Sequence, residues 1–116
     1  MRNPLVIIHV DHQHIELERP YKPDDLCAET IPKGFISDGA SIPRFLWSTI
    51  GSPFHPPFIP AALYHDYLLS LPRGLLWDKK KIDREFHRLL IANGVSRFRA
   101  GLMYQAVRVF GGRKEN

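Results

Sequence analysis

The sequence has a single cysteine among its 116 residues and no apolar run long enough to cross a bilayer. One cysteine excludes an internal disulfide and a thiolate-rich metal site. A membrane-spanning helix needs about 20 consecutive apolar residues. The first apolar stretch, Leu5 to Val10, is also too short for the hydrophobic region of a signal peptide. We therefore expect synthesis in the cytoplasm without a leader.

The charge balance is mildly basic. Sixteen Lys and Arg against twelve Asp and Glu give a net charge of +4, and 44% of the residues are hydrophobic. The hydrophobic share is ordinary for a globular protein and excludes general disorder. A basic surface permits binding to nucleic acid, anionic lipid or an acidic partner. No aromatic residues interleave with the run Lys79–Lys81, so we expect a solvated surface there and no nucleic-acid partner.

The first third of the chain is typical of short strands and loops. Leu5–Val10 is rich in β-branched residues and His14–Glu18 alternates polar with apolar residues, which predicts two strands joined by a turn. Arg19–Glu29, with two prolines, is predicted to be a loop. Thr30–Ser37 is predicted to be extended.

Helices are predicted for most of the remaining chain. Asp78 is a plausible N-cap, and Gly94 is a plausible C-terminal stop for the helix between them. Four proline residues between Ser52 and Pro60 predict an irregular segment. The predicted helices are a short one from Pro43 to Gly51, then Ala61–Leu71, Lys79–Asn93 and about Ser96–Phe110, where Phe98, Leu102, Gln105, Ala106 and Val109 recur at helical spacing.

These elements predict a small α+β fold in a single domain, residues 1–116. Residues 1–34 form its β-rich N-terminal part, residues 35–111 its helical core, and residues 112–116 a polar tail. Two long antiparallel helices within the core are expected to carry His65 and Asp83.

His65 and Asp66 are the most informative pair in the sequence. Both lie within a stretch that is apolar nearly all round, and such a helix is usually buried. Burying ionisable groups is costly unless each finds a partner. Adjacent helical residues point about 100° apart, so the two side chains must face different partners. They are either two parts of a functional site or a satisfied core histidine beside an ordinary surface aspartate.

Asp83 lies at the margin of the apolar stripe formed by Ile82, Phe86 and Leu89. Two antiparallel helices joined by a short link can bring it beside His65. A carboxylate on one imidazole nitrogen fixes the tautomer and leaves the other nitrogen as a general base. The alternative is an acid near the helix N-terminus that is favoured by the helix dipole.

Asp38 and Gly39 lie in a predicted turn, Ser37–Ser41. Calcium prefers carboxylate and backbone carbonyl oxygens on a bent loop. Asp38 and the carbonyls near Gly39 can supply several such oxygens, and Asp66 can supply another. The alternative is an ordinary turn without a metal.

The order of these motifs resembles the phospholipase A2 superfamily, and most closely its small secreted bacterial and fungal class. The pattern D-G-A-S-I-P followed by H-D also resembles an uncharacterised domain family found in phages and prophages. The residues that carry the resemblance are Asp38-Gly39, Pro53-Phe54, Pro57–Ala61, His65-Asp66, Asp83, Phe86, and the run from Ala100 through Tyr104 to Gly111.

The resemblance implies a phospholipase A2-like helical core and calcium-dependent hydrolysis of phospholipid acyl esters. His65 and Asp83 would be the catalytic pair, with His65 as general base. Ca²⁺ would be held by Asp38, the Gly39 backbone and Asp66. The implied partner is a phospholipid or membrane surface.

Two departures from the phospholipase A2 pattern favour an alternative function. Ala40 and Ala62 stand where the secreted class has a pair of cysteines, and Leu69 stands where the superfamily has a tyrosine. The alternative is a non-catalytic phage virion or tail component that keeps the fold as a scaffold, with other phage structural proteins as partners. We accordingly expect a location in a phage virion or delivery to the cell envelope.

Apolar side chains before the His65 helix have two interpretations. Trp47, Phe54, Phe58 and Ile59 either form an apolar mouth that meets lipid or pack in the core.

Overall fold

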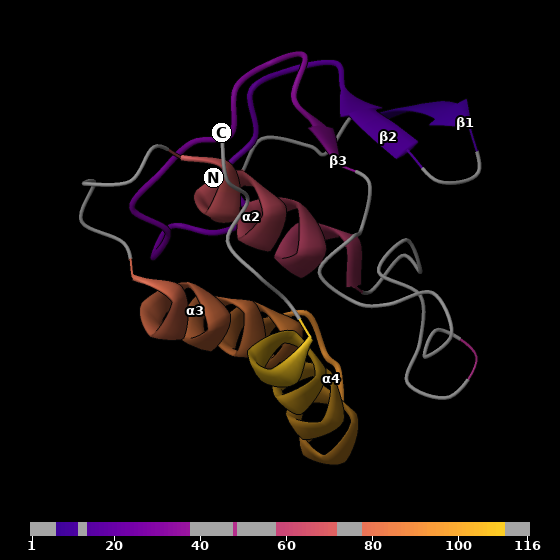
Figure 1. Cartoon of the computed structure of the whole chain (residues 1–116). Coiled ribbons are helices and arrows are strands. Elements are labelled where there is room, and N and C mark those ends of the chain that lie inside the picture. The colour runs from indigo at the N-terminus through magenta and orange to yellow at the C-terminus, as the bar shows by residue number, and fades with distance from the viewer. Residues whose placement is uncertain (1–6, 12–13, 38–47, 49–57, 72–77, 111–116) are drawn as a thin grey trace. The chain divides into compact units, whose positions relative to one another are not determined.

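The computed structural model describes residues 7–11, 14–37, 48, 58–71 and 78–110 (Figure 1). They form a small α+β structure, as the sequence predicts. The chain divides into two units, Met1–Asp38 and Gly39–Asn116. The first carries the strands and the second the helices. The predicted short helix from Pro43 to Gly51 lies almost entirely outside the described residues.

The N-terminal unit contains a three-stranded antiparallel sheet in the order β1-β2-β3. Strand β1 is Ile7–Asp11, β2 is His14–Leu17 and β3 is the two-residue Ile36–Ser37. The predicted pair of strands is therefore confirmed, and the pairing of β1 with β2 shifts register between His9 and Asp11.

Strand β2 alternates as predicted. Ile15 and Leu17 are buried, whereas His14 and Glu16 are partly exposed. In the loop that follows, Tyr21 and Ile31 exchange two backbone hydrogen bonds of 2.9 and 2.8 Å. One isolated antiparallel β-bridge therefore joins the predicted loop to the predicted extended segment.

Helix α2, Ile59–Ser70, opens the helical unit. It begins two residues before the predicted start, because Pro60 lies in its first turn rather than in the irregular segment. Proline is tolerated there, since the first backbone N–H groups of a helix have no partner within it. Ten of the twelve α2 residues are buried, as the nearly all-apolar sequence predicts.

Helix α3, Lys79–Ala92, begins at its predicted first residue and ends one residue before the predicted Asn93. The Asp78 carboxylate accepts a 2.8 Å hydrogen bond from the Lys81 backbone N–H and caps the N-terminus. At the other end Gly94 has a positive φ of 89°. The Val95 N–H donates to the Leu90 carbonyl and the Gly94 N–H to the Ile91 carbonyl, which is the pattern of a Schellman C-terminus.

Helix α4, Arg97–Val109, is capped by Ser96, whose hydroxyl accepts a hydrogen bond from the Arg99 N–H. Its buried face consists of Ala100, Met103, Ala106 and Val107. This face differs from the one marked by Phe98, Leu102 and Val109, all three of which are exposed.

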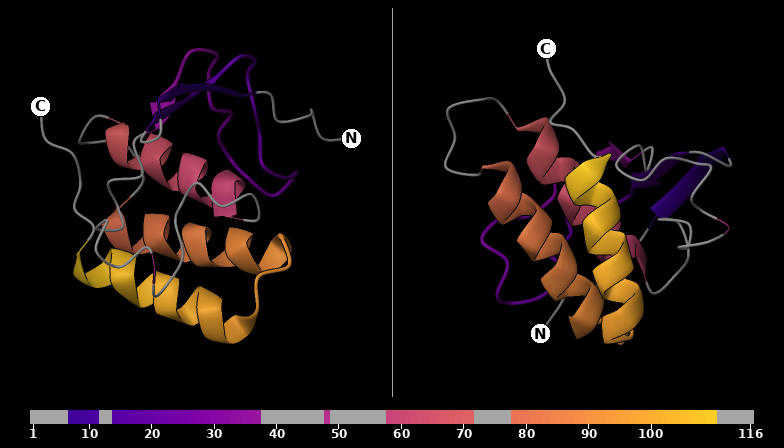
Figure 2. Two further views of the ribbon diagram at one scale, coloured as in Figure 1. Left: turned by 90° about the vertical axis from the view of Figure 1, so that its right-hand side faces the viewer. Right: turned by 60° about the horizontal axis from the view of Figure 1, so that its bottom comes forward.

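Helix α3 packs against both α2 and α4. Figures 1 and 2 show α2 and α3 side by side and running in opposite directions, so the predicted antiparallel pair is confirmed. Within the part of the chain that the structure describes, no helix is long and apolar enough to cross a membrane.

Replacing each of two glycines with alanine should change the free energy of unfolding in opposite directions. Gly94 has φ near +89° and Gly101 does not have a positive φ, and neither would place an added methyl group against another atom. Gly94→Ala should lower the free energy of unfolding by about 1–2 kcal/mol, because the left-handed conformation is strained for alanine. Gly101→Ala should raise it by about 0.5–1 kcal/mol, because glycine costs conformational entropy inside a helix. Urea denaturation checks both signs, and equal effects would contradict the C-terminal geometry of α3.

Candidate functional site

His65 lies near the middle of α2 and is 1% exposed. Its ring packs on the ring of Phe86 from α3, with 4.9 Å between the centroids and a tilt of 49°. Phe86 is also fully buried. An imidazole in this position is held in one orientation by its neighbours, which is a precondition for a defined chemical role.

Asp83 lies on α3 and is the hydrogen-bond partner of His65. The distance between His65 Nε2 and Asp83 Oδ1 is 2.6 Å, and the Asp83 side chain is 0% exposed. The predicted contact between these two residues is therefore confirmed, while their catalytic role stays a prediction. Asp83 lies beyond the first turn of α3, so its partner is the imidazole rather than the free N–H groups at the helix end.

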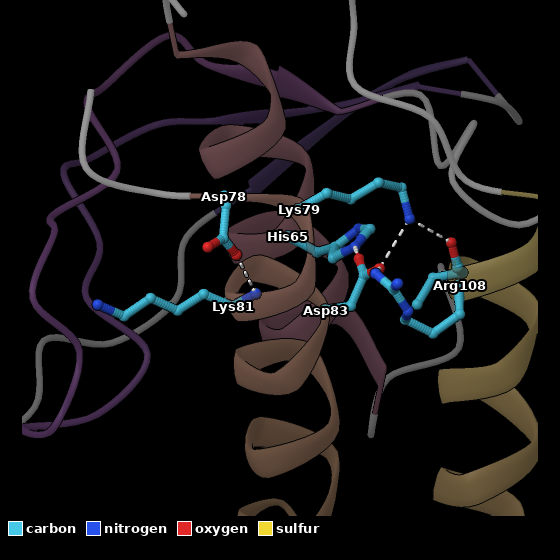
Figure 3. A network of polar contacts seen from close by, with 7 residues as sticks. His65, Asp78, Lys79, Lys81, Asp83 and Arg108 are labelled. Carbon is cyan, nitrogen blue, oxygen red and sulfur yellow. Dashed lines mark hydrogen bonds and ion pairs between the residues drawn. The ribbon is translucent and has the colours of Figure 1, made fainter. Parts of the chain in front are cut away.

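Two cations complete the surroundings of Asp83, and sequence reasoning missed both. Lys79 Nζ donates to Oδ2 at 2.7 Å, and Arg108 NH1 donates to the same oxygen at 2.9 Å. Lys79 also donates to the Val107 carbonyl oxygen at 2.8 Å. Figure 3 shows His65, Lys79 and Arg108 converging on the one carboxylate. We call these four residues, His65, Lys79, Asp83 and Arg108, the Asp83 network.

The Asp83 network draws on three helices. His65 comes from α2, Lys79 and Asp83 from α3, and Arg108 from the last turn of α4. The i,i+4 spacing of Lys79 and Asp83 is a sequence signal for an ion pair on a helix. Arg108 is 25 residues from Asp83, and nothing local in the sequence points to it.

The pKa of Asp83 is lowered. Burial alone would raise the pKa of this carboxyl, but hydrogen bonds from His65, Lys79 and Arg108 outweigh it and favour the charged form. An ionised carboxylate can accept hydrogen bonds but cannot donate one. His65 Nε2 therefore carries the proton of the shared bond, and in the neutral ring Nδ1 has the lone pair.

The predicted calcium ligands fall mostly outside the described residues. Asp38 and Gly39 are not described, and Asp66 is 1% exposed on α2. The interpretation of Asp66 as an ordinary surface aspartate is therefore wrong. No three His, Cys, Asp or Glu side chains of the described segments gather as metal ligands would. The described residues thus supply one candidate ligand, and the calcium site stays a prediction.

The apolar mouth predicted before α2 is corrected in part. Phe58 and Ile59 are buried and belong to the core, which was the alternative interpretation. Trp47 and Phe54 lie outside the described residues. So does Ala40, one of the two positions at which the secreted class has a cysteine.

Comparison with known proteins places the chain by family. The model of a family described as "Protein of unknown function (DUF1353)" matches residues 14–107. The uncharacterised protein y4jT of Sinorhizobium fredii is 38% identical over 81 residues, which is 70% of this chain and 23% of y4jT. The uncharacterised protein y4iH of the same organism is 36% identical over 77 residues, 66% of this chain and 31% of y4iH.

These findings correct the resemblance to the phospholipase A2 superfamily. The matching family and both relatives are uncharacterised, and nothing among them points to that superfamily. No solved structure matches the chain significantly. The chain spans less than a third of the length of the curated relatives it matches. The motifs that suggested the resemblance are short, and the same residues occur here in a different family.

The Asp83 network predicts a specific acid sensitivity. Because the folded state lowers the pKa of Asp83, its carboxylate stabilises the fold fully above the unfolded pKa of about 4, and this contribution is lost as the pH falls through the folded pKa. Asp83→Asn should cost about 1–3 kcal/mol at neutral pH, since donors are left facing an amide. The difference from the wild type should shrink below about pH 4, as measured by urea denaturation at several pH values.

Glu85→Gln is the matched control on the same helix. It breaks the 2.9 Å ion pair of Glu85 with Arg88, in which both side chains are partly exposed, and such pairs contribute below about 1 kcal/mol. An Asp83→Asn variant that costs no more than Glu85→Gln would contradict a stabilising role for the network.

Calcium binding is tested through thermal stability. A ligand that binds only the folded chain raises the melting temperature, so millimolar Ca²⁺ should raise that of the wild type and not that of Asp66→Asn. Asp25→Asn, which changes an exposed acid, should keep the shift. The same calcium shift in all three proteins would remove Asp66 from the metal site.

Proposed function

The chain belongs to this family of unknown function, and from the Asp83 network we propose that it is a hydrolase in which His65 activates water against an ester carbonyl. The observation that carries the proposal is the 2.6 Å bond between two fully buried side chains, His65 Nε2 and Asp83 Oδ1. A general base must be positioned and must present the correct tautomer before its acidity matters. Asp83 supplies both conditions by accepting the Nε2 proton.

The proposed reaction forms no covalent bond between the substrate and the enzyme. His65 Nδ1 takes a proton from water as the water oxygen attacks the carbonyl carbon. The imidazolium that forms is stabilised by the adjacent Asp83 carboxylate. The tetrahedral species then expels the alcohol oxygen, which receives the proton from Nδ1. One ester and one water give one acid and one alcohol.

The substrate we propose is a phospholipid acyl ester, which is the substrate that the resemblance implied. A net charge of +4 favours the approach to anionic lipid. Ca²⁺, if bound through Asp66 with Asp38 and the Gly39 backbone, would polarise the ester carbonyl. The proposal concerns this segment, because the matched residues cover 23% of y4jT and 31% of y4iH.

The second candidate function is a non-catalytic scaffold, as in a phage virion or tail. The observation that favours it is the sharing of one carboxylate among donors of three helices, which is also what a structural lock requires. Burial of His65 to 1% exposure fits a structural group as well.

His65→Gln separates the two candidates. The glutamine amide can still donate to Asp83, but it has no ring nitrogen to take a proton from water. Under the hydrolase proposal, fatty-acid release from mixed phospholipid vesicles should fall by about 10²–10⁴-fold while the melting temperature changes little. The assay is run with and without a calcium chelator.

His87→Gln is the matched control. His87 lies one turn along α3, partly exposed, with its ring edge against Tyr104, and its change should leave fatty-acid release intact. Release that survives His65→Gln would exclude His65 as the base. A wild type without release from any vesicle, combined with a large stability loss in Asp83→Asn, would favour the scaffold.

A further inference from the structure

Helix α4 exposes large apolar side chains on the face away from its core. Phe98 is 79% exposed, Leu102 39% and Val109 70%. Positions four and eleven residues apart on a helix differ by about 40° and 20° in direction, so these three side chains form one line. We call Phe98, Leu102 and Val109 the α4 stripe. Helix α4 is the yellow helix that comes forward in the right panel of Figure 2.

The α4 stripe is separate from the buried face of the same helix. Ala100, Met103 and Val107 are buried, and helical geometry places the middle of that face more than about 100° from the stripe. Single exposed apolar residues are common on protein surfaces. A line of three, one of them a phenylalanine exposed over most of its area, is typical of a contact surface.

The charges on α4 are all of one sign. Arg97, Arg99 and Arg108 lie on this helix, and it has no acidic residue. At 100° per residue, Arg97 lies on one side of the α4 stripe and Arg99 on the other, whereas Arg108 donates to the buried Asp83. An apolar stripe with an arginine on each side is the pattern of a helix that lies in the plane of a membrane surface.

We propose that α4 docks on the surface of an anionic lipid bilayer through the α4 stripe. Phe98, Leu102 and Val109 enter the boundary between headgroups and acyl chains, and Arg97 and Arg99 contact anionic headgroups. A second copy of this chain is a poorer occupant, because pairing two stripes would bring arginines against arginines. The inference rests on the proposed function, because the role of docking would be to bring the Asp83 network to a lipid ester.

Vesicle co-sedimentation tests the docking directly. The 116-residue chain should bind vesicles of phosphatidylcholine mixed with phosphatidylglycerol and bind phosphatidylcholine alone weakly, and added salt should weaken the binding. Phe98→Ser combined with Leu102→Gln should reduce binding about tenfold or more, because two apolar side chains no longer leave water. Arg97→Gln with Arg99→Gln should reduce the preference for anionic vesicles.

Leu26→Ser is the matched control. Leu26 is 77% exposed in the N-terminal unit, so its change removes an apolar side chain about as exposed as Phe98 and should leave vesicle binding unchanged. Equal losses in the Leu26 and Phe98 variants would overturn the assignment to α4. Absence of binding to anionic vesicles would overturn the docking itself. If the protein forms a concentration-dependent dimer and the Phe98 variant abolishes that dimer, then the α4 stripe binds a second copy of the chain instead of a membrane.

The two proposals fail separately. Vesicle binding without fatty-acid release, in the presence of Ca²⁺, would overturn the hydrolase and leave the docking. Release from a dispersed short-chain ester without vesicle binding would overturn the docking and leave the hydrolase.

Discussion

A buried negative charge is the constraint on which the helical unit depends. Asp83 is fully buried, and a carboxylate removed from water is costly unless donors surround it. His65, Lys79 and Arg108 provide those donors from three helices. His65 and Arg108 reach Asp83 from α2 and α4 over hydrogen bonds of 2.6 and 2.9 Å, so the carboxylate keeps these donors only while both helices stay packed near α3. The polar network thus specifies an arrangement that apolar packing alone would leave less defined.

The same interaction underlies both candidate functions. A carboxylate that accepts the Nε2 proton of His65 orients the imidazole and fixes its tautomer, and those are properties of a general base. The cations on Oδ2 neutralise Asp83 and bind the helices together, and those are properties of a structural lock. A static arrangement of four residues serves either purpose. The deciding property is whether proton transfer at Nδ1 matters, and stability measurements alone do not report it.

The resemblance to phospholipase A2 and the argument from residue chemistry selected the same pair, His65 and Asp83. The comparisons remove the superfamily but not the chemical argument, because that argument required a histidine and a carboxylate on facing edges of two antiparallel helices. A histidine–aspartate pair is a general solution to orienting an imidazole, so it arises in unrelated families. The short motifs were therefore better guides to a local arrangement than to ancestry.

Local rules in the sequence determined the elements and their ends. Asp78 and Gly94 bound α3 because a side-chain cap and a positive φ are satisfied within a few residues. The burial of α2 followed from its predominantly apolar composition. Tertiary packing alone decided which face of α4 turns inward, because Phe98, Leu102 and Val109 recur at the same spacing whether a face is buried or exposed. It also brought Arg108 to Asp83 across 25 residues, since an ion pair at that separation depends on how two helices pack and leaves no local pattern.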